Sequence, residues 1–127
     1  TVDFVSITRL KYRDDFVMIP EFHVLVRNLL RRLSTLSWFY QGREVDTDFR
    51  TLINKAEAVS SENLSIAWSD WKRYSGRSKN TMDFGGFTGR IRYRGNLSDY
   101  LPLLLFGSLV NVGKGTTFGL GQYLVEP

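Results

Sequence analysis

The most restrictive feature of this sequence is a regular alternation of side chains from residue 86 to residue 94. One set is apolar or small, and the other is polar and mostly basic. The first set is Phe87, Gly89, Ile91 and Tyr93, and the second is Thr88, Arg90, Arg92 and Arg94. Successive side chains of a β-strand point to opposite faces of its sheet. The alternation therefore predicts a half-buried strand of an antiparallel sheet, with the first set against the core.

An amphipathic helix is predicted over residues 20–41. With about 100° of rotation per residue, its apolar side chains gather on one face, and Arg27 and Arg31 lie opposite. The apolar set is Phe22, Leu25, Val26, Leu29, Leu33 and Leu36. Pro20 suits a first helical turn, where no amide donor is needed, and Gly42 is a typical stop.

Three further strands are expected, over residues 2–12, 64–74 and 118–125, because each segment mixes polar residues with strong β formers. Residues 75–80 are rich in turn formers, so the strands 64–74 and 86–94 are predicted to form a hairpin. The predicted sheet has four strands.

Two more helices complete the chain. A short one begins at Asp46 or Thr47, and a longer one begins at Ser98 or Asp99 and ends at Gly113. The inner stripe of the longer helix is Leu101, Leu104, Leu105 and Ser108 or Leu109. The order is strand, helix, short helix, strand, strand, helix, strand. This order predicts the α+β class and a ferredoxin-like βαββαβ fold, with a four-stranded antiparallel sheet and a short inserted helix.

The composition limits the chemistry. A chain of 127 residues supports one domain. The absence of cysteine excludes disulfides, zinc ribbons, iron–sulfur centres and thiolate nucleophiles. The single histidine, His23, excludes a metal site built from several histidines, and it falls at the margin of an apolar helix face. We interpret His23 as a boundary residue, and we expect no catalytic residue, no metal and no cofactor.

Positive charge is concentrated in one part of the chain. Residues 72–94 carry seven basic side chains against one acidic, a balance of +6, whereas the rest of the chain sums to −2. Clustered cations gain free energy by releasing counterions from phosphates, so this segment favours a polyanion site. A solvated basic face is the alternative.

Glycine is concentrated too, since nine of the eleven lie between residues 85 and 121. The densest segment is GKGTTFGLG at residues 113–121, in which exposed backbone amides and a lysine suit a phosphate. The Walker pattern fails in its spacing and because Gly115 follows Lys114. A dinucleotide fingerprint fails because Phe118 stands in place of its third glycine. The alternative is a set of turn glycines with positive φ.

From this chemistry we predict that the glycine-rich segment places backbone donors, one ammonium group and two hydroxyls on the phosphates of a polyanion, and that one strand face adds a ladder of arginines. The predicted phosphate-binding residues, which the family resemblance described next assigns to RNA, are Gly113, Lys114, Gly115, Thr116, Thr117, Gly119, Gly121, Arg90, Arg92 and Arg94.

Six segments carry a resemblance to a known family. They are FVSITRLK (4–11), IPEF (19–22), NLLRRLS (28–34), FGGFTG (84–89), LPLLLFG (101–107) and GKGTTFGLGQY (113–123). Together they cover nearly the whole chain, and they resemble the CRISPR-associated endoribonucleases of the RAMP superfamily that process repeat transcripts. Ile7 departs from the pattern, since such sequences often have proline there.

The resemblance implies an enzyme of two ferredoxin-like domains, with residues 1–127 as the C-terminal one. Such enzymes cleave repeat transcripts into guide RNAs without metal, as a ribose 2′-hydroxyl attacks the adjacent phosphate. In many members the catalytic residues belong to the N-terminal domain. The implied partners are CRISPR repeat RNA, the N-terminal domain of the same protein and other CRISPR-associated subunits. The start on Thr1 agrees with a piece cut from a longer protein.

Other interpretations remain open. The arginines of the alternating strand also suit an edge strand protected by charge. The run 86–89 is similar to the third strand of an RNA-recognition motif, but arginines replace the stacking positions. We interpret Trp38, Trp68 and Trp71 as core or domain-interface residues. The whole chain also suits a non-catalytic ferredoxin-like RAMP subunit or interaction module.

The longest apolar stretch, residues 101–106, is far shorter than the roughly 20 residues of a membrane span. The sequence also lacks the pattern of a signal peptide at its start. We therefore expect a soluble, cytoplasmic protein with no membrane partner.

Overall fold

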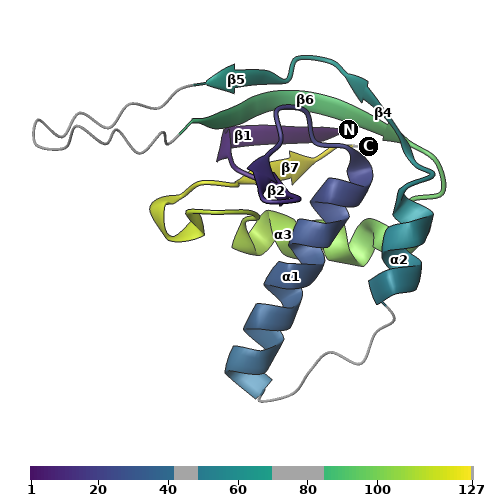
Figure 1. Ribbon diagram of the computed structural model, residues 1–127, viewed down its shortest axis with the longest axis vertical. Helices are drawn as coiled ribbons and strands as arrows, with labels where there is room; N and C mark the ends of the chain where they lie inside the picture. The colour runs from purple at the N-terminus through teal and green to yellow at the C-terminus, as the bar shows by residue number, and fades with distance from the viewer. Residues whose placement is uncertain (42–48, 70–84, 127) are drawn as a thin grey trace, which may run out of the picture.

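The computed structural model describes residues 1–41, 49–69 and 85–126, which form a sheet covered by helices on one face (Figure 1). The sheet order is β4-β6-β1-β7, all pairs are antiparallel, and β5 pairs with β6 beside β4. The strands are β1 (Val2–Thr8), β4 (Ser60–Asn63), β5 (Ala67–Ser69), β6 (Gly86–Arg94) and β7 (Tyr123–Val125). The helices are α1 (Phe22–Gln41), α2 (Phe49–Ala56) and α3 (Leu101–Val110).

This arrangement confirms the predicted α+β, ferredoxin-like fold. One crossover helix joins β1 to β4, another joins β6 to β7, and the short inserted helix α2 follows α1. The two short strands β4 and β5 share one of the four predicted strand positions. No helix among the described residues combines the length and hydrophobicity that a bilayer crossing needs.

The alternating segment is the centre of the sheet. Phe87 and Ile91 are fully buried and Tyr93 is nearly so, which confirms the predicted core face of β6. The Tyr93 hydroxyl donates to the carbonyl of Pro20, and burial raises its pKa, so it stays protonated as a donor. The edge-strand interpretation is wrong, because β1 pairs with one side of β6 while β4 and β5 pair with the other.

The strand expected at 64–74 is displaced and broken. β4 starts four residues earlier, and all of its residues are exposed, so it lacks the alternation that marks a half-buried strand. The break lies where the N–H groups of Leu64 and Ser65 both donate to the carbonyl of Arg90, as in a β-bulge. Opposite the bulge, Gly89 has φ +118°, and a Cβ there would overlap the Ser65 backbone. The predicted turn at 75–80 lies outside the described residues.

Helix α1 confirms the predicted amphipathic helix, although it begins two residues after Pro20. Its buried face is wider than the predicted stripe, since Val24 and Leu30 are buried as well. The reason is that α1 contacts helices on both sides, α2 and α3. The predicted start of the short helix lies outside the described residues.

The predicted inner stripe of α3 is mostly wrong. Leu104 is buried, but Leu101, Leu105 and Leu109 are exposed. The helix is turned so that Gly107 faces the core, where a Cβ would overlap the side chains of Leu29 and Tyr123. The absence of a side chain at residue 107 thus lets α3 approach α1 closely, and the leucine pattern alone does not reveal this.

The predicted cap of α3 is also wrong. Ser98, Asp99 and Tyr100 form a 3-10 turn before the helix, and the Ser98 hydroxyl donates to Asn96. Pro102 sits in the first turn of α3, and no side chain caps the helix start. The 3-10 turn therefore takes the place of the expected cap.

The last strand is shorter than expected. β7 starts at Tyr123 instead of residue 118, because residues 116–118 form a 3-10 turn and the next residues continue the turn. The sequence pattern did not predict a second sheet of two short strands, β2 (Lys11–Tyr12) and β3 (Asp15–Phe16). This second sheet and the turn before β7 lie at the end of the main sheet opposite the chain termini (Figure 1).

Candidate functional site

The glycine-rich loop, residues 113–121, connects α3 to β7. Its four glycines, Gly113, Gly115, Gly119 and Gly121, all have φ between +79° and +87°. A Cβ at Gly113 or Gly121 would overlap the backbone of Arg9 or Val112, respectively, whereas Gly119 has open space. The interpretation as turn glycines with positive φ is therefore confirmed for the shape of the loop.

The loop uses some of its backbone donors internally. The N–H of Gly119 donates to the carbonyl of Thr116, and the N–H of Gly121, which is buried, donates to Ile7. In the described part of the chain, no acceptor is paired with the N–H of Gly113, Gly115, Thr116 or Thr117. These four backbone amides of the loop are available to a ligand.

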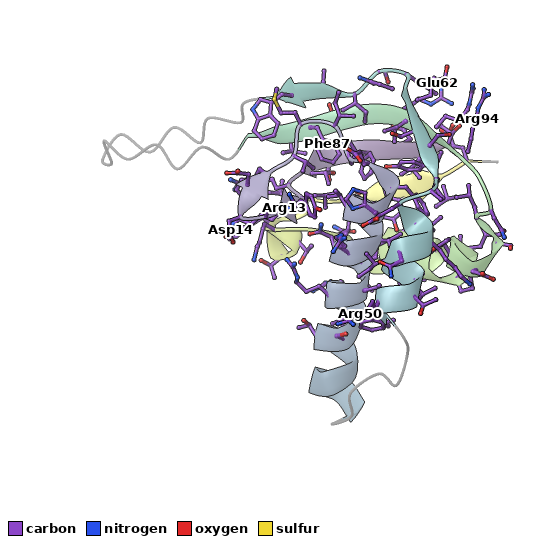
Figure 2. All side chains as sticks on the ribbon, turned by 45° about the vertical axis from the view of Figure 1, so that its right-hand side comes forward. Arg13, Asp14, Arg50, Glu62, Phe87 and Arg94 are labelled. Atoms are coloured by element: carbon purple, nitrogen blue, oxygen red, sulfur yellow. The ribbon has the colours of Figure 1, made fainter. Side chains whose placement is uncertain are left out.

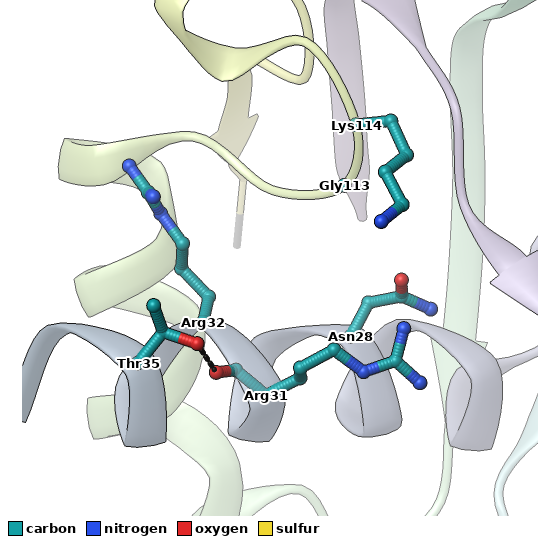
Figure 3. A pocket seen from close by; sticks show the side chains of 6 residues that line it. All are labelled: Asn28, Arg31, Arg32, Thr35, Gly113 and Lys114. Atoms are coloured by element: carbon teal, nitrogen blue, oxygen red, sulfur yellow. Dashed lines mark hydrogen bonds between the residues drawn. The ribbon is translucent and has the colours of Figure 1, made fainter. Parts of the chain in front are cut away.

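The basic pocket lies where the loop passes over α1 (Figure 3). It has a volume of about 150 Å3. Its lining residues are Asn28, Arg31, Arg32 and Thr35 from α1, with Gly113 and Lys114 from the loop. The side chain of Lys114 points from the loop toward Asn28 on the helix. The pocket thus brings one predicted site residue with an ammonium group, Lys114, next to a helix that the site prediction left out.

The pocket carries positive charge without a described counterion. No carboxylate in the described ranges lies within 4 Å of the charged nitrogens of Arg31, Arg32 or Lys114. One Nη of Arg32 donates to the carbonyl of Val110, at 2.9 Å, and so caps the end of α3 just before the loop. Arg32 therefore holds the loop in place, while Arg31 and Lys114 remain available to an anion.

Size and charge together define what the pocket fits. Sites for drug-sized ligands usually have about 300–1,000 Å3. At about 150 Å3 the basic pocket is too small for a whole nucleotide, but it suits one phosphate group. Guanidinium and ammonium groups form charge-assisted hydrogen bonds with phosphate oxygens.

The arginine ladder, Arg90, Arg92 and Arg94, has a different environment. Arg90 contacts the carboxylate of Glu126. One oxygen of Glu62 lies 3.3 Å from Arg92 and 3.5 Å from Arg94. The ladder lies on the sheet face away from the helices, and Arg94 and Glu62 lie beside each other in Figure 2. Arg90 and Arg94 are thus exposed and Arg92 is half-buried. All three are ion-paired, and the structure does not bring them to Lys114.

His23 is engaged inside the fold. Its Nε2 lies 3.2 Å from a Glu21 carboxylate oxygen, and its Nδ1 accepts from Nε of Arg27 at 3.2 Å. The ring also packs edge-on against Tyr12. Among the described residues, no three His, Asp or Glu side chains are grouped as metal ligands would be. Of the three tryptophans, Trp68 is half-buried on β5, whereas Trp71 and the Trp38 side chain lie outside the described part.

Sequence reasoning missed the helix side of the pocket. The pattern that marks it is the spacing 28, 31, 32 and 35, which places four polar side chains on one face of a helix. Of these four residues, only Arg31 was placed opposite the apolar stripe, and none was assigned to the predicted site. The information that it faces the glycine-rich loop comes from the packing of α3 against α1.

Several solved structures have the same fold as this chain. A chain of Cas6 solved as a product complex matches with a TM-score of 0.65 and 20% identity, over 99% of this chain and 50% of that one. Cas6 from Thermus thermophilus matches with a TM-score of 0.64 and 16% identity, over 97% of this chain and 51% of that one. At these identities the likeness concerns the fold. This chain spans about half the length of those chains.

A third solved structure is larger. A partial Cas6-RT-Cas1–Cas2 complex matches with a TM-score of 0.70 and 16% identity, over 98% of this chain and 22% of that one. No curated protein is significantly similar in sequence. The family described as CRISPR-associated endoribonuclease Cas6 matches residues 2–123. A match over almost the entire sequence, on a ferredoxin-like fold, shows that this chain belongs to the Cas6 family of CRISPR-associated endoribonucleases.

Proposed function

We propose that this chain is the RNA-binding part of a CRISPR-associated endoribonuclease that cleaves repeat transcripts into guide RNAs. The basic pocket carries this proposal, because two available cations meet a space of phosphate size. A phosphate of the RNA backbone lies between Arg31 and Lys114 and accepts hydrogen bonds from both. The unpaired amides of Gly115, Thr116 and Thr117, with the hydroxyls of the two threonines, donate hydrogen bonds to the adjacent phosphates and sugars of the RNA.

The loop glycines have a separate role in this proposal. Gly119 and Gly121 hold the loop in shape, since their N–H groups already donate within the chain. Gly113 brings the loop close to Arg9 and so places Lys114 over α1. The arginine ladder contributes little to RNA binding, because its charges are paired with carboxylates.

The chemical step is assigned to the N-terminal domain of the same protein. In this mechanism a ribose 2′-hydroxyl attacks the adjacent phosphate without metal, which requires a base, an acid and positive charge on the phosphorane. His23 is not assigned to that step, because both ring nitrogens have partners within the fold. The proposed setting is the cytoplasm and antiviral defence, with other CRISPR-associated subunits of the RAMP superfamily as further partners.

A non-catalytic RAMP subunit or interaction module is the second candidate. The exposed leucines of α3 favour it, since Leu101, Leu105 and Leu109 follow one another at helical spacing on the surface. A stable complex with a second protein, together with RNA binding that mutation of the pocket leaves unchanged, would favour this candidate.

Binding of a labelled CRISPR repeat transcript in EDTA, measured between 50 and 200 mM salt, tests the main proposal. We expect binding that weakens steeply with salt, no cleavage by the chain alone, and a roughly tenfold loss of affinity in Lys114→Ala. Salt-insensitive binding would contradict the phosphate contact. Cleavage by the chain alone would contradict the placement of the chemistry elsewhere.

A further inference from the structure

The second sheet forms a short hairpin beside the basic pocket. In this basic hairpin, residues 11–16, Lys11 pairs with Phe16 and Tyr12 pairs with Asp15. Arg13 and Asp14 form the two-residue turn, with φ of +53° and +66°. Such turns favour Asn-Gly or Asp-Gly, because side chains rarely adopt positive φ. An arginine held in this conformation is an observed outlier of the kind found at functional positions.

The basic hairpin is fixed to the pocket from two sides. The N–H of Lys114 donates to the carbonyl of Arg9, at 3.0 Å, just before the hairpin. The side-chain amide of Asn28 donates to the carbonyl of Lys11, at 3.2 Å. Leu10, between these two contacts, is fully buried. Because Lys114 and Asn28 both line the basic pocket, the hairpin and the pocket are held in one arrangement.

The two aromatic rings of the hairpin, Tyr12 and Phe16, already form cation–π contacts. Arg9 and Lys11 lie over the Phe16 ring, 4.3 and 5.1 Å from its centre, and Arg13 and Arg27 lie at 5.2 and 5.1 Å from the centre of the Tyr12 ring. A guanidinium on a ring keeps its charge and its donors while its side chain loses freedom. These rings are therefore poor stacking platforms for bases, and the hairpin presents ordered cations suited to phosphate.

We propose that the basic hairpin is a second phosphate contact for the RNA, with Arg13 at its tip and Lys11 on its flank, next to the phosphate in the basic pocket. This proposal rests on the proposed function. Figure 2 shows Arg13 and Asp14 together at the exposed tip. Neither Asp14 nor Asp15 forms an ion pair in the described part of the chain. No described carboxylate neutralises the Arg13 guanidinium, so it can form a hydrogen bond with an RNA phosphate. The negative charge of Asp14 nearby weakens that contact.

The double substitution Arg13→Asn with Asp14→Gly tests the proposal most sharply. It installs the preferred turn and leaves the net charge unchanged, because one cation and one carboxylate are removed together. We expect an unfolding midpoint in urea equal to or higher than that of the wild type. We expect affinity for a labelled CRISPR repeat transcript to fall about fivefold to tenfold. The slope of log K against log salt is expected to fall by about 0.7–0.9, as for one lost phosphate contact.

Single substitutions separate the two charges. Arg13→Asn is expected to weaken binding, Arg13→Lys to retain most of it, and Asp14→Gly to strengthen it about twofold. If the double variant does not fold, the comparison of the Lys and Asn variants at residue 13 decides the question. Equal affinity for those two variants, or wild-type affinity in a folded double variant, overturns the hairpin contact.

Lys114→Ala distinguishes failure of this inference from failure of the proposed function. If Lys114→Ala weakens RNA binding but the hairpin double variant does not, only the hairpin contact is wrong. If neither changes RNA binding, the pocket and the hairpin are both wrong, and the proposed function loses its main support.

Discussion

Two groups of cations in this chain have opposite surroundings. The arginine ladder on β6 faces two carboxylates, those of Glu62 and Glu126. The basic pocket has Arg31 and Lys114 with no carboxylate in ion-pair distance within the described residues. An exposed pair must be separated before its cation serves a phosphate, so the ladder gains less from RNA than the pocket does. The availability of a cation, rather than the number of cations, marks the better site.

The backbone explains why the two groups differ. Glu62 on β4 lies directly across from Arg92 on β6, and opposite charges in such cross-strand positions stabilise the pair. The pocket is built from α1 and the glycine-rich loop, and neither segment contains an aspartate or glutamate. Sheet pairing thus neutralises one group of cations, while the helix and loop leave the other available.

Removing both pocket cations, in Arg31→Ala with Lys114→Ala, is expected to have the largest effect. Affinity for a labelled CRISPR repeat transcript should fall about 30-fold to 100-fold, because two charge-assisted contacts with phosphate are lost. The free energy of unfolding should change by less than about 0.5 kcal/mol for each exposed side chain. Filter binding and urea unfolding on the same samples measure both quantities. A variant that unfolds, but binds normally when folded, would show that the pocket is structural.

Glycine substitutions test whether the pocket depends on the loop shape. Gly121→Ala should lower the free energy of unfolding by about 2–4 kcal/mol, because its Cβ overlaps the Val112 backbone at positive φ. Gly119→Ala is the matched control with similar φ but open space, and we expect a loss of about 1 kcal/mol. Urea unfolding measures the difference. Equal losses would mean that close packing at Gly121 contributes nothing.

Neutralising the ladder, in Arg92→Gln with Arg94→Gln, is expected to lower RNA affinity less than threefold. The charge change equals that of the pocket double variant, so the two proteins form a matched comparison. If the ladder variant lost as much RNA affinity as the pocket variant, the ladder would contact RNA despite its carboxylate partners.

Glu62→Gln is expected to have the smallest effect and the opposite sign. It releases Arg92 and Arg94 from their shared partner, so RNA affinity should rise about twofold, with the rise lost at high salt. Weaker binding in this variant would contradict the view that Glu62 competes with RNA for these arginines.

The sequence predicted the strands and helices in which one face is buried, because burial of one face sets a regular pattern of apolar side chains. The alternation in β6 is confirmed, and so is the apolar stripe of α1 from Phe22 to Leu29, because these side chains pack against the core. Leu33 and Leu36, further along the predicted stripe, are half-buried. The sequence did not predict β4, whose side chains are all exposed. It placed the wrong face of α3 inward, because Gly107 decides the approach of that helix and a glycine carries no hydropathy pattern.

The candidate site divides in the same way. Lys114 and the glycine-rich loop were expected from local chemistry, and the loop has the positive φ values that glycine allows. The ion pairs of the ladder were not expected, because they depend on the register of β4 against β6. The helix side of the pocket and the basic hairpin were missed as well, since their proximity to Lys114 follows from tertiary contacts with Asn28 and Arg9.

The most direct test is the salt dependence of repeat RNA binding by the two charge-matched double variants. Each lacks two positive charges, from either the pocket or the ladder. We expect the slope of log K against log salt to fall by about 1.4–1.8 in Arg31→Ala with Lys114→Ala. We expect a change below about 0.5 in Arg92→Gln with Arg94→Gln. The reverse order, or equal changes in both variants, would contradict the assignment of the RNA contact to the basic pocket.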